Sequence, residues 1–133
     1  MHQGSCLCKG VTFTVAGELP PIQVCHCSQC RHAQGTPFAT NIPVAEVQVT
    51  WLSGVELIHY YESSPGKFRC FCKTCGSPLF SKRASLPGIL RMRAGTFDGD
   101  LLSRVGVHIY HGSKAHWWTG LDDAPKFDEM PPV

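Results

Sequence analysis

The eight cysteines of this 133-residue chain fall in three short groups, which constrain the fold more than any other feature. The groups are Cys6 and Cys8; Cys25, Cys27 and Cys30; and Cys70, Cys72 and Cys75. Cysteines two residues apart suit one shared metal ion better than separate disulfides, particularly in a reducing compartment. The spacing therefore predicts metal binding, against the alternative of buried thiol pairs without metal.

The composition indicates a folded, globular chain. Hydrophobic residues make up 43% and charged residues 17%, which excludes a disordered chain, because such chains are poor in apolar side chains and rich in charge. The length suits a single zinc-binding domain over residues 1–133. No apolar stretch approaches the roughly 20 residues that span a bilayer. The N-terminal run MHQGSCLCKG has no apolar core of a signal peptide, so we expect a cytoplasmic protein without a membrane partner.

The charge pattern disfavours a nucleic-acid partner. The formal net charge is only +2, and the basic residues are scattered. Their densest clusters are Lys82-Arg83 and Arg91-x-Arg93. A nucleic-acid binder usually shows a basic run or a strongly basic domain.

Short runs with β-strand character predict a mainly β fold, an antiparallel open barrel or sandwich. The expected strands cover residues 9–15, 22–27, 38–42, 46–51, 56–61, 67–71, 78–82, 89–94 and 105–111. Glycine, proline and serine separate most of them, which is typical of turns. Helical turns are expected only near residues 29–34 and 113–117. The acidic, proline-rich tail from residue 121 is expected to pack as a strap anchored by Trp117, Trp118 and Phe127.

The run CKTCG at residues 72–76 is typical of a zinc knuckle, in which one tight turn presents two thiolates. A tetrahedral structural site needs two further ligands. Cys6 and Cys8 are the natural pair, because residues i and i+2 of an extended segment project to the same side. Zinc held by Cys6, Cys8, Cys72 and Cys75 would bridge strands far apart in the chain.

Cys25, Cys27 and Cys30 form a local set of three thiolates. Structural zinc sites close with four protein ligands, whereas catalytic sites keep one position open. An open position would hold an incoming thiol as a thiolate nucleophile. The alternative is a second structural site closed by Cys70 or a histidine such as His26 or His32, and the spacing does not choose between them.

For the side chains near the three cysteines, the sequence leaves alternative roles open. His26 should point away from its neighbouring cysteines and is expected in a supporting or surface position. Arg31 would stabilise the thiolates, grip a substrate carboxylate, or simply face solvent. His108 and His111 are expected on opposite faces of a late strand, so they should not pair. Cys70 is a spare buried thiol or an alternate ligand.

Taken together, the motifs resemble the glutathione-dependent formaldehyde-activating enzyme family, which includes centromere protein V. The resemblance is carried by GSCLCKGV at residues 4–11, CHCSQCR at 25–31 and FCKTCG at 71–76. It continues through His108-Ile109, Trp117 and Pro125-Lys126-Phe127. Cys70 is an additional thiol outside the family pattern.

The resemblance implies an Mss4-like, mostly antiparallel β fold with two zinc ions. Cys6, Cys8, Cys72 and Cys75 would hold the structural ion; Cys25, Cys27 and Cys30 would hold the catalytic one, whose free position takes the glutathione sulfur. The implied activity is that of a carbon–sulfur lyase, which interconverts S-(hydroxymethyl)glutathione with glutathione and formaldehyde.

We therefore expect a zinc-dependent lyase acting on a small thiol–aldehyde adduct. The main alternative is a non-enzymatic zinc module that binds a protein or nucleic acid. An exposed apolar patch around Trp117-Trp118 would favour a protein partner. A thiol switch that releases zinc on oxidation is the third class.

Overall fold

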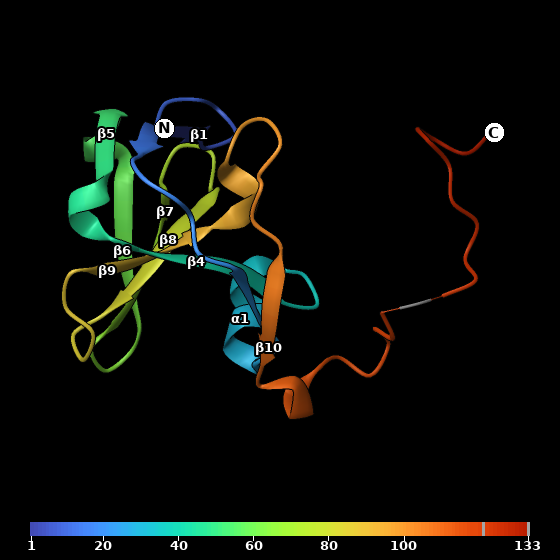
Figure 1. The fold of residues 1–133 in the computed structure, drawn as a ribbon. Coiled ribbons are helices and arrows are strands. Elements are labelled where there is room, and N and C mark those ends of the chain that lie inside the picture. Colours follow the sequence, from blue (N-terminus) through green and yellow to red (C-terminus); the bar gives the residue numbers. More distant parts are fainter. Residues whose placement is uncertain (121, 133) are drawn as a thin grey trace.

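The computed structural model describes residues 1–120 and 122–132 as a mainly β protein with one α-helix (Figure 1). The strands are β1 (His2–Ser5), β2 (Thr12–Val15), β3 (Ile22–Cys25), β4 (Ala39–Ala45), β5 (Val49–Ser53), β6 (Ile58–Ser64), β7 (Lys67–Cys72), β8 (Pro78–Arg83), β9 (Ile89–Arg93) and β10 (Val105–Ile109). The helix is α1 (Ser28–Gln34). Single 3-10 turns are η1 (Glu46–Gln48), η2 (Val55–Leu57), η3 (Ala94–Thr96) and η4 (His111–Ser113).

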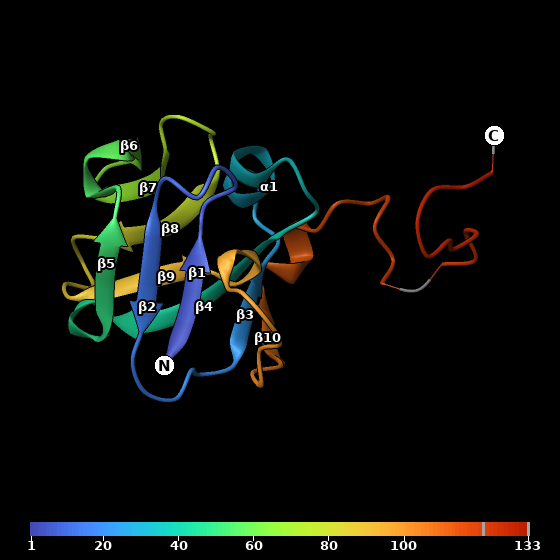
Figure 2. The same ribbon diagram turned by 90° about the horizontal axis from the view of Figure 1, so that it is seen from above.

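The strands form two sheets that do not close into a barrel. The smaller has the order β1-β2-β5, and the larger has the order β10-β3-β4-β9-β8-β7-β6. All pairings between named strands are antiparallel except that of β10 with β3. Figure 2 shows the smaller sheet lying over one face of the larger one. The predicted open, mostly antiparallel β architecture is confirmed.

Aromatic side chains join the two sheets. Phe13 of β2 is fully buried and meets the ring of Trp51 edge-on, with the centroids 5.6 Å apart. Trp51 in turn lies 5.5 Å from the ring of Phe80 on β8. The alternation of Phe13 and Val15 with threonines places these apolar side chains in the core, as the period of two predicted. This packing leaves the opposite face of the larger sheet to α1.

All nine expected strands are present, with shifted ends. The strand β1 was not expected from the sequence, because its residues His2–Ser5 are mostly polar and include a glycine. A Cβ atom at Gly4 would collide with the Phe13 ring and with the carbonyl oxygen of Thr96, so this position needs glycine. Pairing with β2, rather than local preference, makes the segment extended.

The prediction of a packed C-terminal strap is wrong. Every residue from 122 to 132 is exposed, and the tail extends away from the two sheets (Figure 1). The side chain of Phe127 is 51% exposed, so it does not anchor the tail. The tail is acidic and rich in proline, and it has too few apolar groups to offset the entropy of packing. No helix among the described residues is long and apolar enough to cross a membrane.

Candidate metal centres

Four cysteines from distant parts of the chain meet at one end of β7. The sulfur atoms of Cys6, Cys8, Cys72 and Cys75 all lie within 4.8 Å of one another. The Cys6 and Cys8 sulfurs are 3.5 Å apart, and those of Cys8 and Cys72 are 3.9 Å apart. A tetrahedral zinc ion with bonds of about 2.3 Å separates its sulfurs by about 3.8 Å. The group therefore fits one metal ion with no further ligand.

The two halves of this group come from two tight turns. Cys72 ends β7, and the turn to Cys75 closes through the bond from Gly76 N–H to the Cys72 carbonyl, 2.7 Å, with Gly76 at φ +78°. Cys6 and Cys8 also lie in a turn, which closes from Lys9 N–H to the Cys6 carbonyl at 3.1 Å. The expected extended segment is wrong at this point: the turn, not strand alternation, brings these sulfurs together.

Hydrogen bonds within this group favour the thiolate form of Cys75 and oppose that of Cys8. The Ser77 hydroxyl lies 3.2 Å from the Cys75 sulfur and, with the N–H of Cys8, lowers the pKa of Cys75 to about 5. The pKa of Cys8 is raised to about 11, although its hydrogen bond with the Gly10 backbone lowers it, because the neighbouring thiols and burial oppose a second charge. Neighbouring thiolates repel one another, and a bound cation would offset this repulsion, so the group favours metal binding.

The second group forms where β3 meets α1. Cys25 is the last residue of β3, Cys27 is the N-cap of α1, and Cys30 lies in the first turn of the helix. Their sulfurs lie within 4.8 Å of one another, and Cys30 N–H donates to the Cys27 sulfur at 3.3 Å. We call these residues the cysteine triad. The N-terminus of α1 positions Cys27 and Cys30, and the end of β3 brings Cys25 beside them.

The triad contains no fourth side chain among the residues that the structure describes. Cys70 is buried on β7 and belongs to neither cysteine group. His26 turns its Nε2 atom toward His108, and His32 places its Nδ1 atom 2.9 Å from the Ser28 carbonyl. None of the three expected candidates for closing the site joins the triad. The donor set fits a metal ion that keeps one position open.

Buried arginines surround the triad. Both terminal nitrogens of Arg69 lie 3.8 Å from the Cys30 sulfur. Strand pairing places Arg69 opposite Ser81, and Ser81 opposite Arg91, in one row across β7, β8 and β9. Arg93 lies two residues further along β9. Burial and neighbouring guanidinium groups lower the pKa of Arg91, and they lower that of Arg93 to about 10.

This concentration of positive charge has no carboxylate beside it. Among residues 1–120 and 122–132 the one ion pair joins Lys126 to Asp122 in the tail. The counter-charges nearest the arginines are therefore the triad sulfurs. Burial raises the pKa of Cys25 to about 12. Burial also opposes ionisation of Cys27, but hydrogen bonds from Cys30 and the charge of Lys67 prevail and lower its pKa.

The open side of the triad faces a cavity of about 630 Å³. Its lining includes Cys25, Cys27, Lys67, Arg83, Arg91 and Tyr110. We call it the cationic cavity, because three basic side chains and no acidic one among the described residues contribute to it. Tyr110 adopts φ +52°, a left-handed conformation that is costly for a bulky residue. Such strain is often found at functional sites.

Three of the histidines, His26, His108 and His111, form a cluster that the sequence did not predict. His26 is fully buried, and its Nε2 atom lies 2.8 Å from Nδ1 of His108. The His111 ring lies 5.9 Å from that of His108, so the prediction that these two stay apart is wrong. The reason is that His111 begins the turn η4 instead of continuing β10. Trp118 also packs on His26, with ring centroids 5.2 Å apart.

Arg31 and the Trp117-Trp118 pair do not form the contacts or the surface patch considered from the sequence. Arg31 does not line the cationic cavity; Arg69 and Arg91 hold the positions expected of it. Trp117 is 63% exposed while Trp118 packs inward, so the pair forms no continuous apolar patch. The signal that was missed is the alternation Lys67-x-Arg69 and Arg91-x-Arg93, since basic residues at a period of two share one face of a strand.

Comparison with known proteins agrees with this arrangement. The model of the family described as glutathione-dependent formaldehyde-activating enzyme matches residues 1–113, which include both cysteine groups. The chain belongs to this family. The match ends before the exposed tail, so the family resemblance covers the two sheets, α1 and both groups of sulfurs.

One curated relative and one solved structure are similar to this family member. A protein of Schizosaccharomyces pombe, named as an uncharacterized lyase, is 34% identical over 79 residues, which cover 59% of this chain and 56% of that protein. The chain thus spans about 56% of the length of this relative. A crystal structure of a Rhodobacter sphaeroides protein matches with a TM-score of 0.63 at 23% identity, covering 78% of this chain and 99% of that one. The second likeness concerns the fold alone.

Proposed function

We propose that this protein is a zinc-dependent carbon–sulfur lyase that acts on an adduct of a small thiol and an aldehyde, such as S-(hydroxymethyl)glutathione. Cys6, Cys8, Cys72 and Cys75 would hold a structural zinc ion, and Cys25, Cys27 and Cys30 a catalytic one. The observation that carries the proposal is a three-sulfur group, open to a cationic cavity, that has no fourth cysteine, histidine or carboxylate ligand among the described residues. Family membership and the lyase name of the S. pombe relative support the reaction class.

A zinc ion on the triad would supply a Lewis-acid position that keeps a substrate sulfur in its thiolate form. The protein's own contribution begins with charge. Arg69, against Cys30, offsets the negative charge of three thiolates. Without that compensation a fourth sulfur anion would be repelled from the site.

The cationic cavity would orient the substrate. Lys67, Arg83 and Arg91 line it beside two of the triad cysteines. A thiol that also carries a carboxylate could therefore bind through its sulfur at the triad and through its carboxylate at the basic side chains. Guanidinium groups bind carboxylates through paired, charge-assisted hydrogen bonds. A free thiol such as glutathione, with two carboxylates, meets these requirements.

In the lyase direction the carbon–sulfur bond of the hemithioacetal breaks, and its electron pair stays on sulfur. The hydroxyl proton leaves as the aldehyde carbonyl forms. Neither His26 nor His32 lines the cationic cavity, so neither lies where it could carry this proton. Tyr110 does line it, and its side chain is 64% exposed, which suits a relay of this proton to water.

Native mass spectrometry of protein purified without chelators tests the proposal. We expect about two zinc ions per chain and a glutathione adduct that Cys27→Ser removes. The same samples would then be assayed for formaldehyde release from S-(hydroxymethyl)glutathione. A single zinc ion that is unchanged by added metal, or turnover unaffected by Cys27→Ser, would refute the proposal and favour a non-catalytic zinc module.

A further inference from the structure

A second cavity, of about 520 Å³, lies between α1 and the strands β6 to β8. Its lining includes Ala33 of α1 together with Tyr61, Phe71 and Pro78 of the strands. None of the triad cysteines lines it, and Gln29 is the one described residue that it shares with the cationic cavity, so the two cavities adjoin but have different walls. Its volume falls within the range of about 300–1,000 Å³ that small-molecule sites occupy. We call it the apolar cavity.

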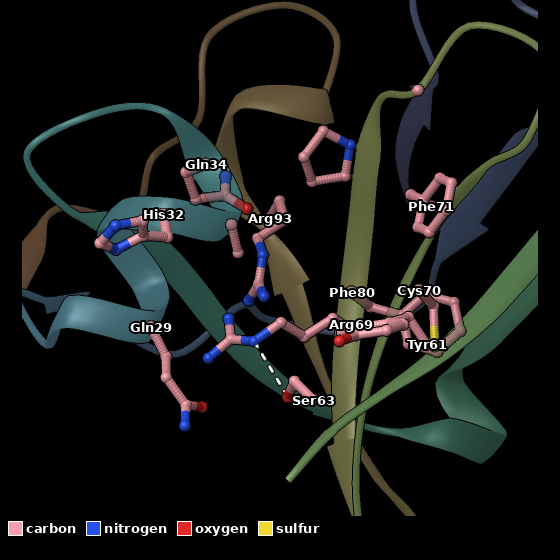
Figure 3. Close-up of a pocket in the computed structure, with 13 residues that line it drawn as sticks. Gln29, His32, Gln34, Tyr61, Ser63, Arg69, Cys70, Phe71, Phe80 and Arg93 are labelled. Atoms are coloured by element: carbon pink, nitrogen blue, oxygen red, sulfur yellow. Dashed lines mark hydrogen bonds between the residues drawn. The ribbon is translucent and has the colours of Figure 1, made fainter.

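Two buried guanidinium groups reach into this apolar cavity. Figure 3 shows the side chains of Arg69 and Arg93 lying between α1 and the strands, with their charged ends close to one another. Arg69 is 8% exposed and Arg93 only 4%. Burying two positive charges side by side is costly, because each repels the other and has lost its water.

Apart from the Cys30 sulfur, which Arg69 contacts, the hydrogen-bond partners of the two guanidinium groups among the described residues are neutral. Arg93 uses Nη1 to donate to the Asn41 side chain, the Ser81 hydroxyl and the Arg91 carbonyl, all of them neutral acceptors. Its buried Nε has no hydrogen-bond partner among residues 1–120 and 122–132. Arg69 donates Nε to Ser63 and touches Cys30, and no described residue lining the cavity is acidic. One anion against the two guanidinium groups would relieve the repulsion.

The lining of the apolar cavity indicates that the ligand also has an apolar part. Apart from the guanidinium groups, much of the lining is aromatic, proline or alanine, so a small inorganic anion would leave most of the cavity unfilled. We propose that the apolar cavity binds a small amphiphilic monocarboxylate, with its carboxylate on Arg69 and Arg93 and its apolar body against Tyr61, Phe71 and Pro78. Arg69 also contacts the triad through Cys30, but carboxylate binding in the apolar cavity does not depend on the proposed lyase reaction.

Isothermal titration calorimetry on the zinc-loaded full chain tests this site. The probes are hexanoate and phenylacetate, with acetate, inorganic phosphate and 1-hexanol as controls. We expect hexanoate to bind at least about tenfold more tightly than acetate, which lacks the apolar body, and than 1-hexanol, which lacks the charge. Phosphate should bind more weakly than hexanoate for the same reason as acetate.

Two tryptophan variants locate the binding site, and a third variant tests the role of charge. Ala33→Trp adds bulk from an exposed helix position that lines the apolar cavity, and should weaken hexanoate binding at least about tenfold. Ala84→Trp is the matched control: Ala84 is also exposed but lines the cationic cavity, so hexanoate binding should be unchanged. Arg93→Met tests the charge, and if it fails to fold, the Ala33→Trp comparison still decides.

Three results would overturn the inference. The first is no detectable binding of either hexanoate or phenylacetate to the unmodified protein. The second is equal affinity for hexanoate, 1-hexanol and phosphate, which would deny the joint need for charge and apolar body. The third is binding that survives Ala33→Trp but is lost in Ala84→Trp, which would assign the carboxylate to the cationic cavity.

Discussion

Both terminal nitrogens of Arg69 lie 3.8 Å from the sulfur of Cys30, which places a buried positive charge directly against the cysteine triad. Arg69 is on β7 and Cys30 is on α1, so the contact joins the larger sheet to the helix that presents the triad. A guanidinium group in this position stabilises the thiolate form of the sulfur that a metal ion needs.

Replacing this charge should weaken metal binding at the triad alone. We expect Arg69→Met to lower zinc affinity there by about 10- to 100-fold, the usual effect of removing a group that supports a metal ligand. Affinity at the four-cysteine group should not change. Competition with a chromogenic chelator, resolved into two sites, measures both. Arg31→Gln is the control, because Arg31 follows the triad in sequence but lies outside the cationic cavity; equal losses in the two variants would contradict the prediction.

The two cysteine groups should differ in what they contribute to folding. Cys6→Ser removes a proposed zinc ligand that would tie the turn after β1 to the end of β7, and we expect it to lower the free energy of unfolding by more than about 3 kcal/mol. Cys27→Ser should cost less than about 1.5 kcal/mol, because serine is a favoured N-cap and keeps the hydrogen bond that Cys30 N–H now donates to the Cys27 sulfur. Urea unfolding of the zinc-loaded proteins tests this difference. Equal stability of the two variants would be incompatible with one structural and one open site.

Local patterns in the sequence predicted the β fold and both sulfur groups. The alternation around Phe13 and the spacing of Cys25, Cys27 and Cys30 depend on neighbours within a few residues, so they were visible before folding. The row Arg69, Ser81 and Arg91 depends on the register of three strands, which no local pattern specifies. The exposed tail was misjudged because its aromatic residue was given an anchoring role that no packing surface supports.

The pH response of the histidine cluster follows from its burial. Burial first, and then the nearby charges of His108, His111 and Lys114, lower the pKa of His26 below 6.5. A histidine with a depressed pKa in the folded state takes up more protons when unfolded, so the stability of the fold falls as pH drops through 6.5 toward the folded pKa. Long-range ¹H–¹⁵N spectra should show the His26 ring still mostly neutral at pH 6.5, where an unperturbed histidine is half charged. His108→Gln removes one of the repelling charges and should raise the pKa of His26. A His26 ring that is already charged at pH 7 would contradict this account.

The cationic cavity predicts which thiols the triad accepts. Arg83 is exposed and lines the cavity with Lys67 and Arg91, so it can be replaced with little effect on folding. We expect Arg83→Gln to weaken glutathione binding by about three- to tenfold, because it removes one of three positive charges at a partly solvated site. Binding of cysteamine, which has no carboxylate, should be unchanged. Native mass spectrometry across a thiol titration measures both affinities, and Lys126→Gln in the exposed tail is the control for loss of one positive charge. Equal losses of affinity for cysteamine and glutathione in Arg83→Gln would show that the cavity does not recognise the carboxylate. If neither thiol binds the unmodified protein, the proposal of an open zinc site is wrong.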